Sequence, residues 1–150
     1  MAELEPLSIL LVEDDLADQK LIKTSLRNQR IANDLYIVNN GEEGLDFLHH
    51  RGNYGSASPQ PDLILLDLNM PGMGGKEFLK RVKKDEKLQH IPVVILTTSD
   101  LDKDILDSYK LQASGYVNKP VTLDEFKEVM TKIKEYWFVL CKRPPKEHQH

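Results

Sequence analysis

Cysteine is nearly absent from this chain of 150 residues, which has only Cys141 and therefore cannot form an internal disulfide bond. The sequence also has no apolar run of membrane-spanning length and no N-terminal signal sequence. These absences predict a cytoplasmic protein that does not insert into a membrane.

An excess of positive charge is also missing, because 20 Lys and Arg residues stand against 24 Asp and Glu residues, giving a formal net charge of −4. Nucleic-acid-binding domains usually carry a basic patch or a strongly basic balance. The composition therefore argues against DNA as a partner. At this length the chain fits a single domain of ordinary size and leaves no room for a second.

Short apolar runs alternate with stretches of helical spacing. The runs cover residues 8–12, 35–38, 63–66, 93–96 and 116–117. Strands that are apolar on both faces and alternate with helices are typical of a parallel sheet covered on both sides, so the sequence predicts an α/β fold of five βα units. Residues 50–61, rich in Gly, Ser and Pro, are expected to form one long loop, and residues 141–150 a short disordered tail.

Polar residues stand where the predicted strands end. Glu13 and Asp14 follow the first strand, Asp67 follows the third, Thr97 the fourth and Lys119 the fifth. The carboxyl ends of parallel strands meet at one edge of a sheet, where ligands usually bind. We therefore expect these side chains to converge.

The converging residue types suit phosphoryl chemistry. Clustered carboxylates favour a hard cation such as Mg²⁺. An aspartate can act as a nucleophile and form an aspartyl phosphate if the incoming negative charge is neutralised. Mg²⁺, the Lys119 ammonium and the Thr97 hydroxyl would each hold one phosphoryl oxygen.

Simpler roles exist for single acids in this set. Asp15 precedes an amphipathic stretch and is expected to be a helix N-cap, with Asp18 in the first turn of the same helix. Asp67 taken alone could be a turn residue before "NMPG". The four polar strand ends together favour the functional interpretation.

The motifs "EDD", "DLNMPG", "TTS" and "KP", in this order at strand ends, resemble the receiver domain of bacterial two-component response regulators over roughly residues 7 to 137. The resemblance implies a flavodoxin-like (βα)5 fold with strand order 2-1-3-4-5, here as a receiver domain at residues 1–140. It implies a stand-alone signalling protein rather than an enzyme, phosphorylated by a sensor histidine kinase and acting through contacts with an unknown downstream protein.

The same resemblance assigns individual roles. Asp67 would be the phosphoacceptor, and Thr97 and Lys119 would contact the phosphoryl group. Mg²⁺ would be held by Asp14, Asp67, the backbone carbonyl of Asn69 and, through water, Glu13. Thr97 and Tyr116 would form the conformational switch, and the peptide bond before Pro120 would be cis, as cis bonds almost always precede proline.

The long loop, the segment "IPVVILTTS" and the terminal "YWF" resemble the small response regulators that partner cyanobacterial phytochrome-type histidine kinases. In the last predicted helix, an apolar stripe is widened on one side by Val129, Tyr136 and Leu140. An exposed apolar edge is a common subunit contact, so the sequence predicts a homodimer through this helix.

Three other classes of protein would place polar residues at the same strand ends. A haloacid dehalogenase-like phosphohydrolase would need a general acid two residues after the nucleophile, where this chain has Asn69. A flavodoxin-like flavin binder would place the flavin phosphate beside Glu13, Asp14 and Asp15, which would repel it. A receiver fold that serves only as a docking module, without phosphorylation, is the third.

Overall fold

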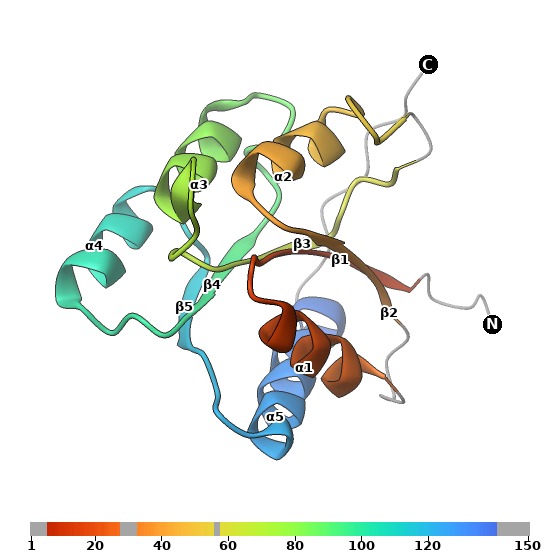
Figure 1. The fold of residues 1–150 in the computed structure, drawn as a ribbon, viewed down its shortest axis with the longest axis vertical. Helices are drawn as coiled ribbons and strands as arrows, with labels where there is room; N and C mark the ends of the chain where they lie inside the picture. Colours follow the sequence, from red (N-terminus) through yellow and green to blue (C-terminus); the bar gives the residue numbers. More distant parts are fainter. Residues whose placement is uncertain (1–5, 28–32, 56–57, 141–150) are drawn as a thin grey trace.

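Five parallel strands form one sheet in the computed structural model, which describes residues 6–27, 33–55 and 58–140, the last three as backbone only. The order is β2-β1-β3-β4-β5, as predicted. The strands are β1 (Leu7–Val12), β2 (Asn33–Val38), β3 (Leu63–Leu66), β4 (Val93–Thr97) and β5 (Gly115–Asn118). The helices are α1 (Leu16–Leu26), α2 (Gly41–Leu48), α3 (Gly74–Lys84), α4 (Asp102–Lys110), α5 (Leu123–Lys134) and the π-helix η1 (Glu135–Leu140). The sheet lies between α1 and α5 on one face and α2 and α3 on the other (Figure 1).

Alternate residues of the central strands face two separate apolar cores, because side chains point to opposite faces along a strand. Leu10 and Val12 face α2 and α3, whereas Ile9 and Leu11 face α1 and α5. These four side chains are all buried, which explains why the strands appear in the sequence as continuous apolar runs.

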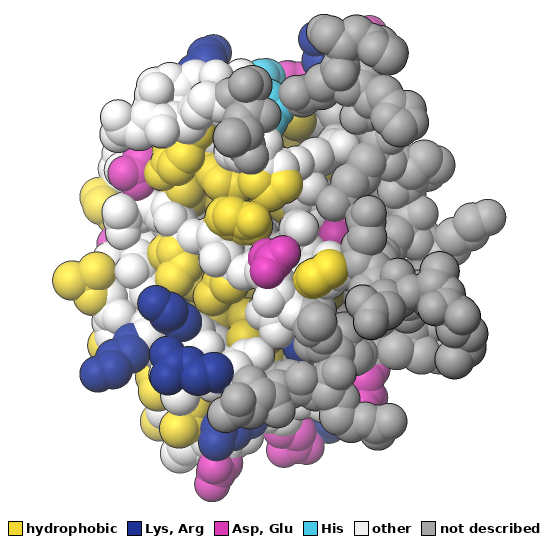
Figure 2. Space-filling view, turned by 90° about the vertical axis from the view of Figure 1, so that its right-hand side faces the viewer, with side chains coloured by type: hydrophobic (Ala, Val, Ile, Leu, Met, Phe, Trp, Pro, Cys, Tyr) yellow, Lys and Arg dark blue, Asp and Glu magenta, His cyan; other side chains and the backbone are white. Residues whose placement is uncertain are grey.

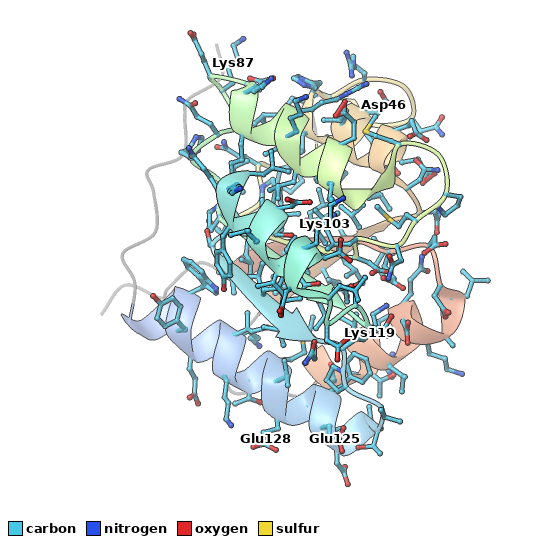
Figure 3. All side chains as sticks on the ribbon, turned by 90° about the vertical axis from the view of Figure 1, so that its left-hand side faces the viewer. Asp46, Lys87, Lys103, Lys119, Glu125 and Glu128 are labelled. Atoms are coloured by element: carbon cyan, nitrogen blue, oxygen red, sulfur yellow. The ribbon has the colours of Figure 1, made fainter. Side chains whose placement is uncertain are left out.

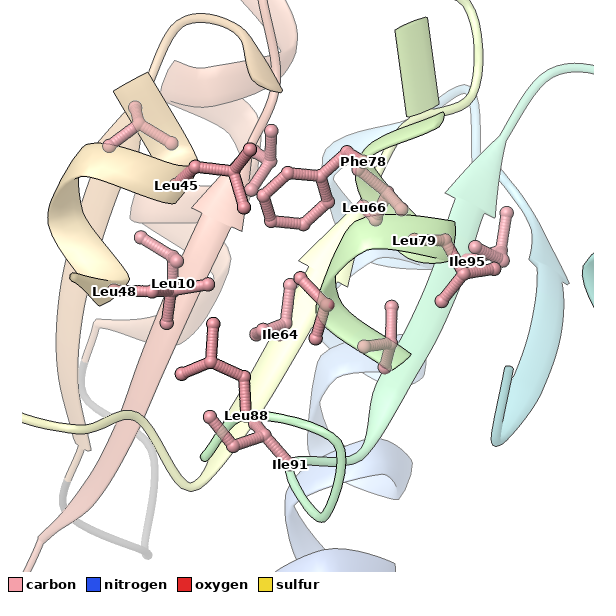
Figure 4. Close-up of a cluster of buried hydrophobic side chains, with 14 of the residues drawn as sticks. Leu10, Leu45, Leu48, Ile64, Leu66, Phe78, Leu79, Leu88, Ile91 and Ile95 are labelled. Carbon is pink, nitrogen blue, oxygen red and sulfur yellow. The ribbon is translucent and has the colours of Figure 1, made fainter. Parts of the chain in front are cut away.

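Phe78 of α3 fills the middle of the first core, where it lies between Leu45 of α2 and Leu66 of β3 (Figure 4). Its side chain is fully buried. A Cβ atom added at Gly44 would come within 2.7 Å of the Phe78 ring, so glycine at this position lets α2 approach α3 closely. The packing holds α3 against the sheet, and the loop after β3 ends where α3 begins.

The last helix buries most of the apolar stripe that its spacing predicts, although Leu123 at its start is only half-buried. Phe126, Met130 and Ile133 are buried, and Trp137 packs partly against the same core. The candidate dimer edge is not fully exposed, because Val129 also packs partly against this core. Tyr136 is half exposed, and the side chain of Leu140 lies outside the described residues, as does the predicted tail at 141–150. The homodimer stays a prediction.

The surface beside β2 shows no broad basic area among the described residues. In Figure 2, Lys and Arg side chains gather mainly at the lower left of this face, with acidic and apolar groups elsewhere. Among the described residues, no helix is long and apolar enough to cross a membrane.

Asp15 is the N-cap of α1, as predicted. Its Oδ1 atom accepts hydrogen bonds from the backbone N–H groups of Ala17 at 2.8 Å and Asp18 at 3.1 Å. We expect Asp15→Ala to lower the free energy of unfolding by about 1 kcal/mol, because two N–H groups of the first turn lose their acceptor. Urea denaturation followed by circular dichroism measures this loss. Asp15→Asn, which keeps an acceptor oxygen, should stay within about 0.5 kcal/mol of the wild type.

Candidate functional site

The carboxyl ends of the strands surround an open cavity of about 630 Å³. Its walls come from the loop after β1, the start of α1, the ends of β3 and β4, and the end of β5, as the sequence predicts. The lining residues are Glu13, Asp14, Asp15, Leu16, Ala17, Asp18, Asp67, Asn69, Thr98 and Lys119. Most of these residues are polar or charged, so the cavity suits a small charged ligand.

Lys119 is the positive centre of this cavity, and Figure 3 shows it where β5 ends, close to α1 and to the start of α5. Its side chain is 5% exposed. The ammonium donates to Glu13 Oε1 at 3.0 Å and to Asp67 Oδ2 at 3.3 Å. Burial acts to lower the pKa of Lys119, but the hydrogen bond to Asp18 and the charge of Glu13 outweigh it and raise the pKa above its usual value. The amine therefore stays protonated.

Three carboxylates form a group that fits a divalent cation. Glu13, Asp14 and Asp67 each offer an oxygen, and these atoms lie within 4.8 Å of one another. Hard cations such as Mg²⁺ and Ca²⁺ take carboxylate oxygens as ligands. Burial, with the negative charge of Asp67 beside it, raises the pKa of Glu13 to about 8. A cation bound among these oxygens would offset the repulsion between them.

Asp67 is buried at the end of β3, and the loop that follows holds it in place. The backbone N–H of Asn69 donates to Asp67 Oδ1 at 3.2 Å, while Lys119 donates to Oδ2. The Asn69 amide also donates to Thr97 Oγ1 at 3.4 Å. Hydrogen bonds therefore connect the end of β3 with the end of β4.

The close approach of α3 to β3 depends on Gly75. A Cβ atom there would lie 2.5 Å from the carbonyl oxygen of Asp67 and 2.6 Å from the Cα of Leu68. Gly74, just before it, has a φ of +75°, a conformation that favours glycine. The "GG" pair thus allows the tight turn that brings α3 against the end of β3.

Thr97 belongs to this network and Tyr116 lies next to it, but neither side chain is part of the wall of the cavity. Thr97 is fully buried, and at this strand end its exposed neighbour Thr98 lines the cavity instead. The Tyr116 hydroxyl donates to the carbonyl oxygen of Ser99 at 2.8 Å. The tyrosine therefore contacts the loop that follows β4, which is where a switch connected to Thr97 would have to act.

The predicted cis peptide bond before Pro120 is wrong. The described part of the chain, which includes Lys119 and Pro120, contains no cis peptide bond. The prediction came from the resemblance alone, and trans is the lower-energy form of an X-Pro bond unless the surrounding structure selects the other. The backbone N–H of Lys119 donates to the Thr97 carbonyl at 2.7 Å, which holds this segment beside β4.

Asp18 is the site residue that the sequence reasoning assigned to a different role. Its Oδ2 accepts a hydrogen bond from the Lys119 ammonium at 2.8 Å, the shortest contact that this amine makes to a carboxylate. The sequence placed Asp18 in the first turn of a helix that starts beside the polar strand ends. That position was the available signal, but it did not show which way the carboxylate points.

Residues 9–131 match the family described as the response regulator receiver domain. The fold and the site define the same class, and this chain belongs to that family: it is a receiver-domain response regulator of the two-component type. Proteins of this family are generally signalling proteins rather than enzymes, and their receiver domains bind a divalent metal. The assignment also decides against the phosphohydrolase and the flavin binder.

Several individual response regulators are similar to this chain over most of its length. The response regulator Rcp1 of Synechocystis sp. (strain PCC 6803) is 39% identical over 132 residues, which cover 88% of this chain and 89% of Rcp1. The crystal structure of the phosphorylated cyanobacterial phytochrome response regulator RcpA has a TM-score of 0.88 and 38% identity, covering 94% of this chain and all of that one. The Mn²⁺-bound form of Rcp1 has a TM-score of 0.85 and 38% identity, covering 93% and 100%.

Proposed function

We propose that Asp67 accepts a phosphoryl group from a sensor histidine kinase in a Mg²⁺-dependent reaction, and that the phosphorylated chain signals through contacts with another protein. One observation carries this proposal: the buried Asp67 carboxylate belongs to a cluster of acids that fits a cation and also accepts a hydrogen bond from the ammonium of Lys119. A nucleophilic carboxylate, a candidate metal-binding site and a buried positive charge therefore lie next to one another.

Each residue has a defined part in the transfer. An Asp67 carboxylate oxygen attacks the phosphorus, the P–N bond to the kinase histidine breaks, and the imidazole keeps the electron pair of that bond. Lys119 neutralises one oxygen of the incoming group. Mg²⁺, when bound by Asp14, Asp67 and the Asn69 carbonyl, with Glu13 through water, supplies further positive charge to the phosphoryl oxygens.

The output follows from the contacts around Thr97. A phosphoryl oxygen on Asp67 would accept a hydrogen bond from the O–H of Thr97, whose oxygen already accepts from the Asn69 amide, and this bond would draw the hydroxyl toward Asp67. Movement of Thr97 would reach the loop that carries Ser99, and Tyr116 is hydrogen-bonded to that loop. Phosphorylation would thus bias the position of the β4–α4 loop and of α4, which gives a partner protein a surface to recognise.

A phytochrome-type histidine kinase is our proposal for the kinase. The support is the likeness to Rcp1 and RcpA over nearly the whole chain, since RcpA is described as a cyanobacterial phytochrome response regulator. We also retain the homodimer through the last helix, which the half-exposed Tyr136 supports.

Incubation with acetyl phosphate and Mg²⁺ should raise the intact mass by one phosphoryl group, because the site can use a small phosphodonor in place of the kinase. The same incubation with EDTA should leave the mass unchanged, because the acidic cluster without a cation repels the donor. Mass spectrometry of the intact protein at several times measures both. A chain that binds Mg²⁺ and gains no mass would favour the docking module over the phosphoacceptor.

A further inference from the structure

Asp18 contacts the phosphoryl-binding lysine but is not part of the metal cluster. Three carboxylates surround the Lys119 ammonium, from Glu13, Asp18 and Asp67. Glu13 and Asp67 belong with Asp14 to the acids that can hold a metal, whereas Asp18 does not. Of these three carboxylates, Asp18 is therefore the one that can bind Lys119 without also binding a cation.

The backbone around Asp18 is held without help from its side chain. The N-cap Asp15 accepts from the backbone N–H of Asp18 at 3.1 Å, which fixes the first turn of α1. In a capping box, the acid three residues after the N-cap would reach back to the N-cap's own N–H. Here the Asp15 N–H instead points to Glu13 Oε1 at 3.4 Å, and the Asp18 carboxylate turns to Lys119.

The other contacts of Lys119 change during the proposed reaction. Mg²⁺ held by this cluster would give the oxygens of Glu13 and Asp67 another positively charged partner. An ammonium has three protons, and one of them must be free for the phosphoryl oxygen. The 2.8 Å hydrogen bond from Lys119 to Asp18 can persist throughout the reaction. Asp18 lies in the first turn of α1, which the N-cap Asp15 stabilises.

We infer that Asp18 is a positioning residue, which holds the Lys119 ammonium at the edge of the cavity so that it meets the phosphoryl group on Asp67. This inference rests on the proposed function, since it deepens the role of the same site. The Asp18 side chain is about one quarter exposed, so Asp18 can be substituted without disturbing the hydrophobic core.

Variants at Asp18 separate positioning from helix stabilisation. Asp18→Ala removes the acceptor and should slow phosphorylation by acetyl phosphate and Mg²⁺ roughly tenfold, as expected for losing a hydrogen bond between charged groups. Asp18→Asn keeps an acceptor oxygen and should stay within about threefold of the wild type. Asp124→Ala is the matched control, because Asp124 is an exposed acid in the first turn of α5 and should leave the rate unchanged.

A second readout follows the lysine itself. The side-chain ammonium signal of Lys119 in ¹⁵N-labelled protein, assigned by its loss in Lys119→Arg, should be sharp in the wild type and in Asp18→Asn. It should broaden in Asp18→Ala, because the ammonium loses its shortest hydrogen bond to a carboxylate and its protons then exchange faster with water. Asp18→Leu gives the same comparison if the alanine variant does not fold.

The two measurements also distinguish a failure of this inference from a failure of the proposed function. A wild-type chain that takes up no phosphoryl group contradicts the proposed function, while the ammonium signal still decides whether Asp18 holds Lys119. A rate for Asp18→Ala equal to or above the wild type, or a Lys119 signal that does not depend on Asp18, would overturn the inference.

Discussion

The Asp67→Asn variant is expected to gain no phosphoryl group from acetyl phosphate and Mg²⁺, whereas the wild type gains one. The amide of asparagine is neutral and its nitrogen lone pair is delocalised, so it cannot replace the carboxylate as nucleophile. The change also removes the negative charge of one of the three carboxylates that fit a cation. Intact mass after incubation measures the result, and a gain that survives the substitution would place the acceptor on another residue.

Loss of uptake in Asp67→Asn must be separated from loss of the fold. Without Mg²⁺ we expect its free energy of unfolding to stay within about 1 kcal/mol of the wild type, because a contact to Lys119 weakens while repulsion with Glu13 disappears. Asp62→Asn is the matched control. Asp62 is also buried, next to β3 but at its opposite end, where its carboxylate accepts from the Ser8 N–H. This variant should take up the phosphoryl group normally.

Gly75→Ala should lower the free energy of unfolding by about 2 to 3 kcal/mol. The new methyl group would meet the Asp67 carbonyl oxygen at 2.5 Å and the Leu68 Cα at 2.6 Å, and both atoms are backbone that cannot turn aside. Alanine favours helix over glycine by about 1 kcal/mol, which offsets only part of this strain. Because the strain acts on Asp67 itself, we also expect slower phosphorylation in the folded fraction.

Urea denaturation would measure the loss of stability in Gly75→Ala, and intact mass at several times after addition of acetyl phosphate and Mg²⁺ would measure its phosphorylation rate. Gly115→Ala is a suitable control, since the nearest atoms to its Cβ are methyl groups of Val94 at 3.8 Å, an ordinary contact. We expect it to change the stability by less than about 1 kcal/mol. Equal stability losses in the two variants would show that close approach at Gly75 is not what makes glycine necessary there.

The parts of this protein that sequence reasoning predicted correctly are those encoded by local patterns. Apolar runs such as Leu63–Leu66 lie between helices, and this pattern was enough for the parallel sheet, whereas the strand order was implied by the resemblance to receiver domains. The cap at Asp15 and the buried stripe through Phe126 follow from spacing within one helix. The polar strand ends converge because a parallel sheet brings its carboxyl ends together.

Other features required contacts between distant segments. The ion pair of Asp18 with Lys119 joins residues 101 positions apart, and only the packing of α1 against the end of β5 gives its direction. Packing also buried Val129 in part, placed Thr98 rather than Thr97 in the cavity wall, and left the bond before Pro120 trans.

The sequence by itself determined the fold, the edge of the sheet that carries the site, and the residue types that meet there. Only the tertiary structure decided which carboxylate holds Lys119 and how closely α3 approaches Asp67. The physical reason is one of range. Periodicity and capping depend on neighbours within a few residues, whereas the orientation of a side chain between two elements depends on how whole helices pack against the sheet.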